Sequence, residues 1–202
     1  MIKRSSKIKI EKLLEDNNWN VLDIGCGYSA NKYANVICDT QDLEHFYKDK
    51  KFIQLKEKKL PFKDKEFDFV IASHVLEHVE DPPFFLNEIQ RISSKGGYIE
   101  VPTKLEDNLV FENKKDHLWH IDFDDDENKL LISKKKNYFE PILTVSSIKK
   151  LQKYFRKSLI IELFWENEIN FYFENKEFEN IEKISRLELL KKFISKKIRS
   201  IF

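Results

Sequence analysis

The chain has 202 residues, of which 41% are hydrophobic and 13% are aromatic, so it can form one substantial core and global disorder is excluded. Its 36 basic and 35 acidic side chains give a net charge of +1, which argues against a broad nucleic-acid-binding surface. The two cysteines, Cys26 and Cys38, have no zinc-type spacing and are predicted to be buried thiols of an intracellular protein.

Short apolar segments alternate with helical patterns through the first half of the chain. A helix is expected over residues 6–17, and another begins at Pro82 or Pro83 and extends to about residue 92. Proline suits a first helical turn because its missing N–H is not needed there. The alternation predicts a mostly parallel sheet. The predicted strands are residues 21–24, 34–38, 52–55, 67–72 and 98–101.

The second half of the chain departs from this pattern. Residues 104–141 are rich in charge and are expected to form an insertion, with a small hairpin, over the carboxyl ends of the strands. A helix is expected from Thr144 to about residue 157. Residues 158–165 and 168–173 are β-rich and are expected to pair with each other as an antiparallel hairpin.

These elements suggest a domain over residues 1–177 and a separate helix over residues 178–202. Apolar residues recur every three or four positions on one face of that helix, and lysines crowd its last turns. The helix could pack on its own domain, pair with a partner chain, or lie on an anionic membrane surface. The chain has no apolar signal core and no run of about 18 apolar residues. We therefore expect a cytoplasmic protein, peripheral at the inner membrane surface if this helix binds lipid.

A glycine turn follows the first predicted strand. Asp23 lies near the end of that strand, and Gly25 and Gly27 would let a ligand approach the main chain because glycine has no Cβ. Asp39 ends the second strand. Because the carboxyl ends of parallel strands share one edge of a sheet, we expect these residues to line a ligand site at that edge.

Three segments, Val21–Gly27, Leu60–Phe62 and Phe67–Val79, follow one another in an order that resembles the class I S-adenosylmethionine-dependent methyltransferases of the small type 11 group. The resemblance extends from Val21 to Pro102. It implies an α/β, Rossmann-like three-layer sandwich whose mostly parallel sheet ends in an antiparallel hairpin. It also implies an enzyme whose cofactor is S-adenosylmethionine.

The resemblance implies roles for individual residues at the strand ends. Asp23 would face the amino-acid end of the cofactor, and Asp39 would accept hydrogen bonds from its ribose hydroxyls. A side chain introduced by Gly25→Val would fill the cofactor's space and leave the fold largely intact. The implied cofactor-binding residues are Asp23, Gly25, Cys26, Gly27, Asp39, Ser73 and His74.

Two alternatives to a methyltransferase stay open. Gly25, Gly27 and Ala30 also fit the G-x-G-x-x-G/A fingerprint of NAD-dependent oxidoreductases. In those enzymes the acid that binds ribose follows about 20 residues later, whereas Asp39 follows Gly27 by 12 positions. The other alternative is a non-catalytic methyltransferase-like scaffold, because Lys56 stands about where the family often has an acidic residue for adenine.

Methyl transfer to an alcohol benefits from a base, and histidine has a suitable pKa. His74, His117 and His120 are the candidate catalytic residues. Residues 115–122 combine aromatic and polar side chains in a way that suits a sugar ring. A small molecule or glycan is therefore the expected substrate, with O-methylation of a sugar hydroxyl as the leading reaction. The alternative is a surface loop pinned by Trp119.

No metal is predicted in the site. Glu77 and His78 are expected to pin a helix to the sheet, as this stretch mostly does in the family. A looser possible ligand set, whose spacing is not typical of a metal site, consists of Asp116, His117, His120 and Asp122.

Overall fold

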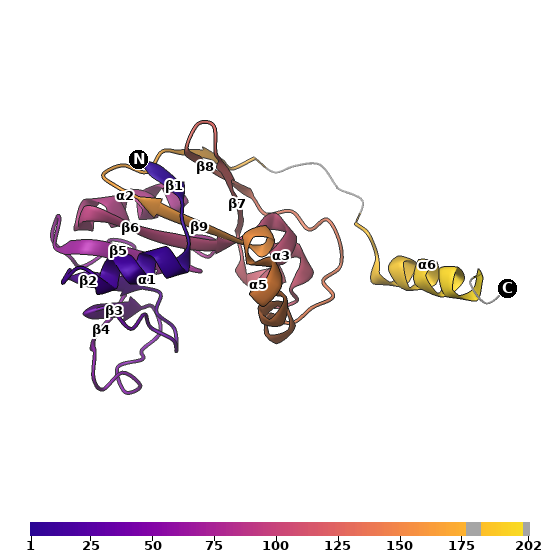
Figure 1. Ribbon diagram of the computed structural model, residues 1–202, viewed down its shortest axis with the longest axis horizontal. Helices are drawn as coiled ribbons and strands as arrows, with labels where there is room; N and C mark the ends of the chain where they lie inside the picture. Colours follow the sequence, from indigo (N-terminus) through magenta and orange to yellow (C-terminus); the bar gives the residue numbers. More distant parts are fainter. Residues whose placement is uncertain (177–182, 200–202) are drawn as a thin grey trace.

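The computed structural model describes residues 1–176 and 183–199 (Figure 1). Within this part of the chain, seven strands form one sheet and three form another. The strands from β2 to β6 run parallel in the large sheet, β9 runs antiparallel to β6, and β1 runs antiparallel to β9. In spatial order the large sheet contains β4 (Lys51–Gln54), β3 (Val36–Asp39), β2 (Val21–Ile24), β5 (Phe67–Ser73), β6 (Ser93–Pro102), β9 (Ile160–Trp165) and β1 (Ile2–Arg4).

Helices α1 (Lys7–Glu15) and α2 (Pro82–Ile92) pack against opposite faces of this sheet. Phe69 and Val70 are neighbours along β5, so their side chains point to opposite faces. Phe69 belongs to the core cluster that contains buried residues of α1, and Val70 belongs to the cluster that contains buried residues of α2. The predicted Rossmann-like three-layer α/β sandwich is therefore confirmed.

Helix α2 begins as the sequence predicts. The Asp81 side chain accepts a hydrogen bond from the Phe84 N–H at 3.0 Å, and Pro82 and Pro83 occupy the first turn. A carboxylate at this position pairs with an otherwise unsatisfied backbone donor and interacts favourably with the helix dipole. The turn that precedes α2 is thereby fixed at the carboxyl end of β5.

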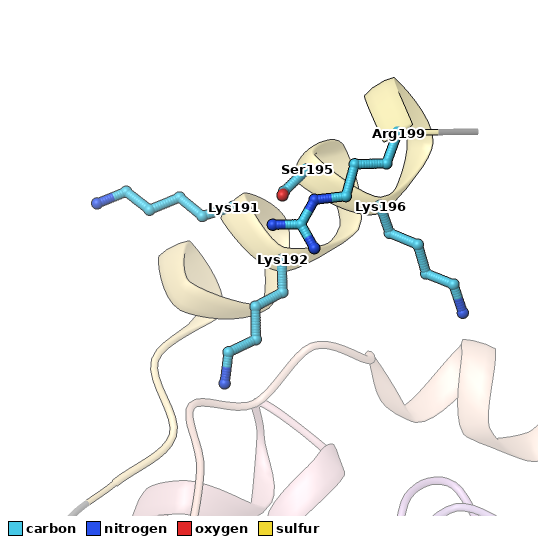
Figure 2. Close-up of a pocket in the computed structure, with 5 residues that line it drawn as sticks. All are labelled: Lys191, Lys192, Ser195, Lys196 and Arg199. Carbon is cyan, nitrogen blue, oxygen red and sulfur yellow. The ribbon is translucent and has the colours of Figure 1, made fainter. Parts of the chain in front are cut away.

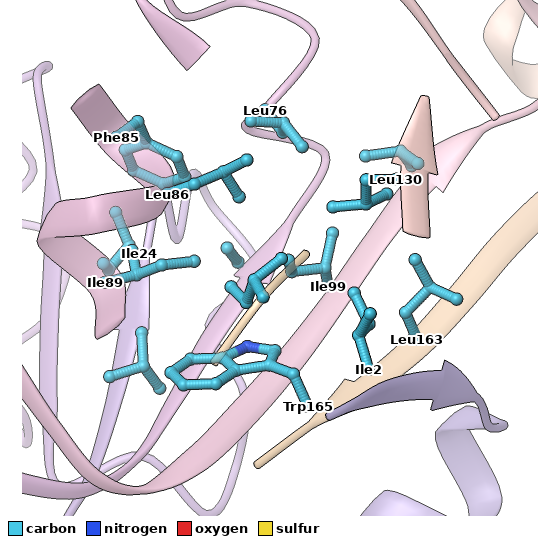
Figure 3. Close-up of a cluster of buried hydrophobic side chains, with 14 of the residues drawn as sticks. Ile2, Ile24, Leu76, Phe85, Leu86, Ile89, Ile99, Leu130, Leu163 and Trp165 are labelled. Atoms are coloured by element: carbon cyan, nitrogen blue, oxygen red, sulfur yellow. The ribbon is translucent and has the colours of Figure 1, made fainter. Parts of the chain in front are cut away.

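The smaller sheet has the order β10 (Phe171–Glu174), β8 (Lys129–Lys134), β7 (Trp119–Asp124). Strands β7 and β8 form an antiparallel hairpin within the segment that was expected to be an insertion. Leu130 of β8 is fully buried in the same core cluster as Trp165 (Figure 3). The smaller sheet therefore shares the core of the large sheet.

Three further helices follow β6 in the chain: α3 (Lys104–Leu109), α4 (Asn113–Asp116) and α5 (Val145–Leu159). Helices α3 and α5 lie side by side near the carboxyl end of β6 (Figure 1). The helix predicted from Thr144 is confirmed. The Thr144 hydroxyl caps α5 by accepting a hydrogen bond from the Ser147 N–H at 3.3 Å.

The antiparallel part of the fold differs from the expected strand pairing. Strand β10 was expected to pair with β9, but it runs parallel to β8 in the smaller sheet. The place beside β9 is taken by β1, in which Ile2 is fully buried opposite Trp165. Burial of Ile2 against the core explains why this short, otherwise basic segment joins the sheet.

The connections from β2 to β3 and from β3 to β4 are loops without helix. The first loop is held by side chains: the Tyr47 hydroxyl donates to the Gly27 carbonyl at 2.7 Å and accepts from the Ala30 N–H at 3.0 Å. The Tyr47 phenol therefore links two main-chain groups of a loop that has no helix to stabilise it.

Helix α6 (Arg186–Arg199) extends away from both sheets, and none of its residues is buried (Figure 1). Its start is held to the domain where Ile184 bridges to Phe139 and Arg186 pairs with Glu140 at 3.2 Å. Packing of the rest of this helix on its own domain, one of the three expectations, is not observed. Among the described residues, no helix combines the length and the apolar character needed to span a membrane.

Candidate active site

The glycine turn after β2 is the first component of the site. Gly25 and Gly27 have φ angles of +65° and +49°, in the left-handed region that favours glycine. The N–H groups of Gly25 and Cys26 both donate to the Cys38 carbonyl, at 2.8 and 3.2 Å. These bonds bend the chain sharply over the end of β3 and bring the turn beside Asp39.

Asp39 closes the other side of the turn. Its Oδ2 accepts from the Gly27 N–H at 2.9 Å, and its Oδ1 accepts from the Gln41 N–H at 2.9 Å. Each carboxylate oxygen has a second lone pair, so Asp39 can still accept further donors such as hydroxyls. The structure thus brings together Gly27 and Asp39, as their positions at neighbouring strand ends predicted.

Asp23 lies within β2 and is 5% exposed. Its Oδ2 accepts from the Asn31 N–H at 2.7 Å. Burial raises the pKa of Asp23 to about 6, against the opposing effects of the Asn31 hydrogen bond and the charge of Lys50. A bound cation near Asp23 would favour its ionised form, which suits the predicted contact with the amino-acid end of the cofactor.

The two cysteines are buried, free thiols: Cys26 lies within this turn and Cys38 lies in β3 beside it. Burial raises the pKa of Cys26 to about 12 and raises that of Cys38 well above its usual value. Both thiols therefore stay protonated and are poor nucleophiles. Cys26 is placed to contribute its main chain to the turn.

The two glycines differ in what surrounds them. A Cβ built at Gly27 would meet no atom of the described chain within 4 Å, whereas a Cβ at Gly25 would lie 2.5 Å from Val75 Cγ2. A side chain at position 25 would therefore require Val75 to shift, which argues against the expectation that the fold would stay largely intact. The open space at this turn lies at Gly27.

His74 follows Ser73 at the carboxyl end of β5, and its side chain is 40% exposed. Its Nδ1 is 3.2 Å from Glu77 Oε1 and its Nε2 is 3.3 Å from Glu100 Oε1. Desolvation lowers the pKa of His74, but the two carboxylates outweigh it and raise that pKa to about 10. An imidazolium at neutral pH can donate hydrogen bonds, but it cannot act as the base for which His74 was a candidate.

Glu100 belongs to a buried polar network that the sequence reading did not single out. Its Oε2 accepts from the Tyr98 hydroxyl at 2.6 Å and from Arg156 Nη2 at 2.7 Å. Glu162 accepts from the same two groups, at 2.9 and 3.0 Å. The available signal was a glutamate within the otherwise apolar strand residues 98–101.

His117 and His120 converge on a buried carboxylate. Asp107 Oδ1 is 2.7 Å from His117 Nδ1, and Asp107 Oδ2 is 3.0 Å from His120 Nδ1. Lys135 Nζ lies 2.9 Å from Asp107 Oδ1. Desolvation opposes ionisation of Asp107, but these three partners hold its pKa well below the usual range. Asp107 and Lys135, distant in sequence, carried no recognisable motif.

This environment leaves little of either histidine accessible to an acceptor. His120 is 2% exposed, its Nε2 contacts the Lys136 carbonyl at 2.7 Å, and its Nδ1 is enclosed beside Asp107. His117 is 9% exposed. Trp119 is also buried, and its indole N–H donates to the Val79 carbonyl at 2.8 Å. The geometry gives His120 a structural role rather than the predicted role of base.

Comparison with known proteins connects this geometry to a family. Residues 22–101 match the family model described as "Methyltransferase domain". An uncharacterised protein of Methanocaldococcus jannaschii is 37% identical over 116 residues, which cover 51% of this chain and 48% of that protein. An uncharacterised methyltransferase of Schizosaccharomyces pombe is 46% identical over 41 residues, which cover 20% of this chain and 15% of that protein. The chain thus spans less than half the length of these curated relatives.

Among solved structures, a protein from Pyrococcus horikoshii is similar with a TM-score of 0.46 and 17% identity, over 81% of this chain and 92% of that chain. The family match covers the glycine turn, Asp39 and the end of β5, which are the parts that the structure gathers at one edge of the sheet. Residues 22–101 therefore match a methyltransferase domain, and the family that this segment resembles uses S-adenosylmethionine as its cofactor.

Proposed function

We propose that the protein transfers a methyl group from S-adenosylmethionine to a hydroxyl of a small molecule or glycan, with a sugar hydroxyl as the leading acceptor. The observation that carries the proposal is the convergence of Asp23, Gly27 and Asp39 at the carboxyl edge of the parallel strands, beside open space at Gly27. When bound there, the cofactor would supply an electrophilic methyl group.

The residues of this edge have separate parts in such a reaction. Asp39 would bind the ribose hydroxyls, and Asp23 would hold the amino group of the amino-acid tail. The missing side chain of Gly27 would allow close contact with the main chain. Alignment of donor and acceptor by such fixed groups can supply much of the acceleration of a direct displacement.

The acceptor side is the less specified part of the site. Ser73 borders the same edge, and its hydroxyl can hydrogen-bond to an oxygen-bearing acceptor, whereas both ring nitrogens of His74 already face Glu77 and Glu100. The Ser73 hydroxyl is the group that supports a hydroxyl acceptor. The burial of Trp119 leaves its ring unable to stack on a sugar, so the aromatic content of residues 115–122 gives the sugar proposal no support.

Calorimetry with S-adenosylhomocysteine tests cofactor binding directly. We expect binding that is weakened in Asp39→Asn, because the amide presents only one acceptor oxygen in place of two. Preference for NAD over S-adenosylhomocysteine would instead favour an oxidoreductase. Incubation with labelled S-adenosylmethionine and separate glycan, small-molecule, lipid and protein fractions then identifies the acceptor. Binding without transfer to any fraction would support the non-catalytic scaffold. The observation that motivates this alternative is Lys56, which stands about where the family often has an acidic residue.

We further propose that α6 docks the protein, from the cytoplasm, on an anionic membrane surface. Apolar side chains of α6 are open to solvent, including Leu187 at 68% and Phe193 at 63% exposure. Basic side chains extend from successive turns of the same helix (Figure 2). A lipid surface with negative headgroups matches both properties, whereas a second copy of this basic helix would add like charges. The basic residues in Figure 2 are Lys191, Lys192, Lys196 and Arg199.

A further inference from the structure

Three side chains from two distant segments meet beside the carboxyl end of β5. Glu77 and His78 lie in the turn after β5, and His117 follows α4. One ligand atom from each lies within 4.8 Å of the others. The rings of His78 and His117 are 4.5 Å apart between centroids and nearly perpendicular. This trio differs from the looser ligand set considered from sequence, in which Asp122 instead pairs with Lys104 at 3.3 Å.

The two segments are joined by their main chains, which fixes the trio. The Leu118 N–H donates to the Glu77 carbonyl at 2.8 Å, and the Trp119 indole N–H donates to the Val79 carbonyl. These contacts lie on both sides of His78 and directly after His117. The three side chains are therefore held together by backbone geometry before any ligand binds.

One of the two histidine rings, that of His78, is oriented by a hydrogen bond as metal ligands usually are, and the ring of His117 has a carboxylate beside it. His78 Nδ1 lies 2.9 Å from the Asp116 carbonyl oxygen, and His117 Nδ1 lies 2.7 Å from Asp107 Oδ1. A metal-bound histidine almost always directs its other ring nitrogen to a carbonyl or carboxylate in this way. In His78 the Nε2 atom is thus the one left to bind a cation. The charge of Asp107 is already balanced by Lys135. Asp107 is therefore assigned the role of orienting His117 and is not counted as a ligand of the cation.

Glu77 supplies an independent indication of a ligand. Its side chain is 1% exposed, and its Oε1 contacts His74. Its Oε2 is buried without a hydrogen-bond partner in the described part of the chain. Leaving a buried carboxylate oxygen unpaired is costly. A cation bound between Glu77 and the two imidazoles would remove that cost.

We propose that Glu77, His78 and His117 form a binding site for a divalent transition-metal cation of the zinc type. Two imidazoles and one carboxylate are a donor set that zinc accepts with tetrahedral geometry. Three protein ligands leave one position for a water molecule or another oxygen ligand. His78 is exposed, so that position can be reached from solvent.

Titration with Co²⁺ alone, followed by visible absorption, tests the site without cofactor or acceptor, and Zn²⁺ calorimetry gives the affinity. The variants are His78→Ala, which alters an exposed ring, and Glu77→Gln, which keeps the side-chain shape. His45→Ala is the matched control, since His45 is an exposed histidine in the loop between β3 and β4. Near-ultraviolet circular dichroism of each variant reports whether its fold is retained.

We expect one equivalent of Co²⁺ to produce visible bands typical of four or five ligands, and Zn²⁺ to displace it. Both site variants should weaken affinity at least ~10-fold, in line with losses typical of metal-site mutations, and His45→Ala should bind like the unaltered protein. Unchanged affinity in His78→Ala with its fold retained would overturn the proposal. Absence of a one-to-one complex in the unaltered protein would overturn it as well.

Discussion

Gly25 and Gly27 both have a left-handed backbone conformation, but the space around their Cα atoms differs. At Gly25 the limiting neighbour is Val75, whereas at Gly27 the space is open. A sequence motif treats the two glycines alike, because it records the need for a turn and not what stands beside each Cα. Only the packing of residue 75, which lies fifty positions from Gly25, distinguishes a glycine enclosed by the fold from one that faces open space.

We predict that Gly27→Ala mainly lowers cofactor affinity, whereas Gly25→Ala mainly lowers stability. In Gly27→Ala the alanine enters the left-handed region at a cost of roughly 1–2 kcal/mol, and its methyl group would occupy the cofactor's space. S-adenosylhomocysteine affinity should fall at least ~10-fold, about 1.4 kcal/mol. Gly25→Ala adds a clash with Val75, so its unfolding midpoint should fall further. Thermal unfolding and calorimetry on both variants decide the matter, and normal affinity in Gly27→Ala would contradict the proposed cofactor position.

Asp23 should make stability depend on pH. Its folded pKa of about 6 lies above its usual value of 3.8, so the folded state holds the proton more tightly than the unfolded state does. The ionised form is therefore penalised in the fold. Stability from this group is full below about pH 4, declines as pH rises to about 6, and is constant above, a loss of about 3 kcal/mol. Urea unfolding of the ligand-free protein at about pH 4.5 and about pH 7 should show a smaller decline in Asp23→Asn than in the unaltered protein.

The same ionisation should favour the cofactor. If Asp23 holds the amino group of the tail, S-adenosylhomocysteine affinity should rise as pH increases through about 6, because the carboxylate forms. Calorimetry across this range checks the trend. An equally steep rise in Asp23→Asn would assign the effect to another group.

At the scale of elements, the parallel strands and α2 follow from the sequence, whereas the partners of the outer strands do not. Strand β5 is apolar on both faces, which marks it as central, and Asp81 with two prolines marks the start of α2. By contrast, β9 and β10 are short β-rich segments without an Asn-Gly turn. Local sequence cannot distinguish pairing between them from pairing with β1 and β8, because tertiary burial makes that choice.

We predict that the N-terminal strand contributes substantially to stability. Ile2 is fully buried and pairs with Trp165. Ile2→Ala should lower the free energy of unfolding by about 2–5 kcal/mol, as large-to-small changes in a core do. Ile8→Ala is the matched control, since Ile8 in α1 is 79% exposed and should change stability by less than about 0.5 kcal/mol. Equal urea midpoints for the two variants would show that β1 is not held in the sheet.

For the whole molecule, the edge that binds the proposed cofactor was predictable and the surroundings of the histidines were not. Asp23 and Asp39 follow from strand order, because parallel strands deliver their ends to one edge. The burial of His117 and His120 depends on Asp107 and Lys135, which come from α3 and from the residue after β8. Such pairing arises when separate segments pack and leaves no periodic pattern in the chain.

The exposed α6 predicts how the whole molecule responds to lipid. The full chain should float with vesicles that contain phosphatidylglycerol, because each basic residue near an anionic surface contributes about 1 kcal/mol. It should not float with pure phosphatidylcholine. A chain ending at Lys176 should lose flotation but change its unfolding midpoint only slightly, because none of the residues of α6 is buried and the Arg186–Glu140 pair that it loses is exposed.

A point substitution refines this test. Phe193→Ser removes an apolar group that is 63% exposed on α6, and Tyr154→Ser removes one that is 83% exposed on α5. Only the first should reduce flotation. Equal flotation of the full and shortened chains would rule out α6 as the membrane contact. Dimerisation in solution that the truncation abolishes would assign the helix to a second copy instead.

The pairing of β1 with β9 also sets an order of events during synthesis. Residues 2–4 leave the ribosome early, but their partner residues 163–165 are made some 160 positions later. At about 5–20 residues per second, the strand waits on the order of ten seconds for its partner. The neighbouring strands β2, β3 and β5 can associate during that interval. Closure of the sheet by β1 is therefore a late step, and a nascent chain that stalls before residue 160 would carry an open edge on β6 that chaperones could recognise.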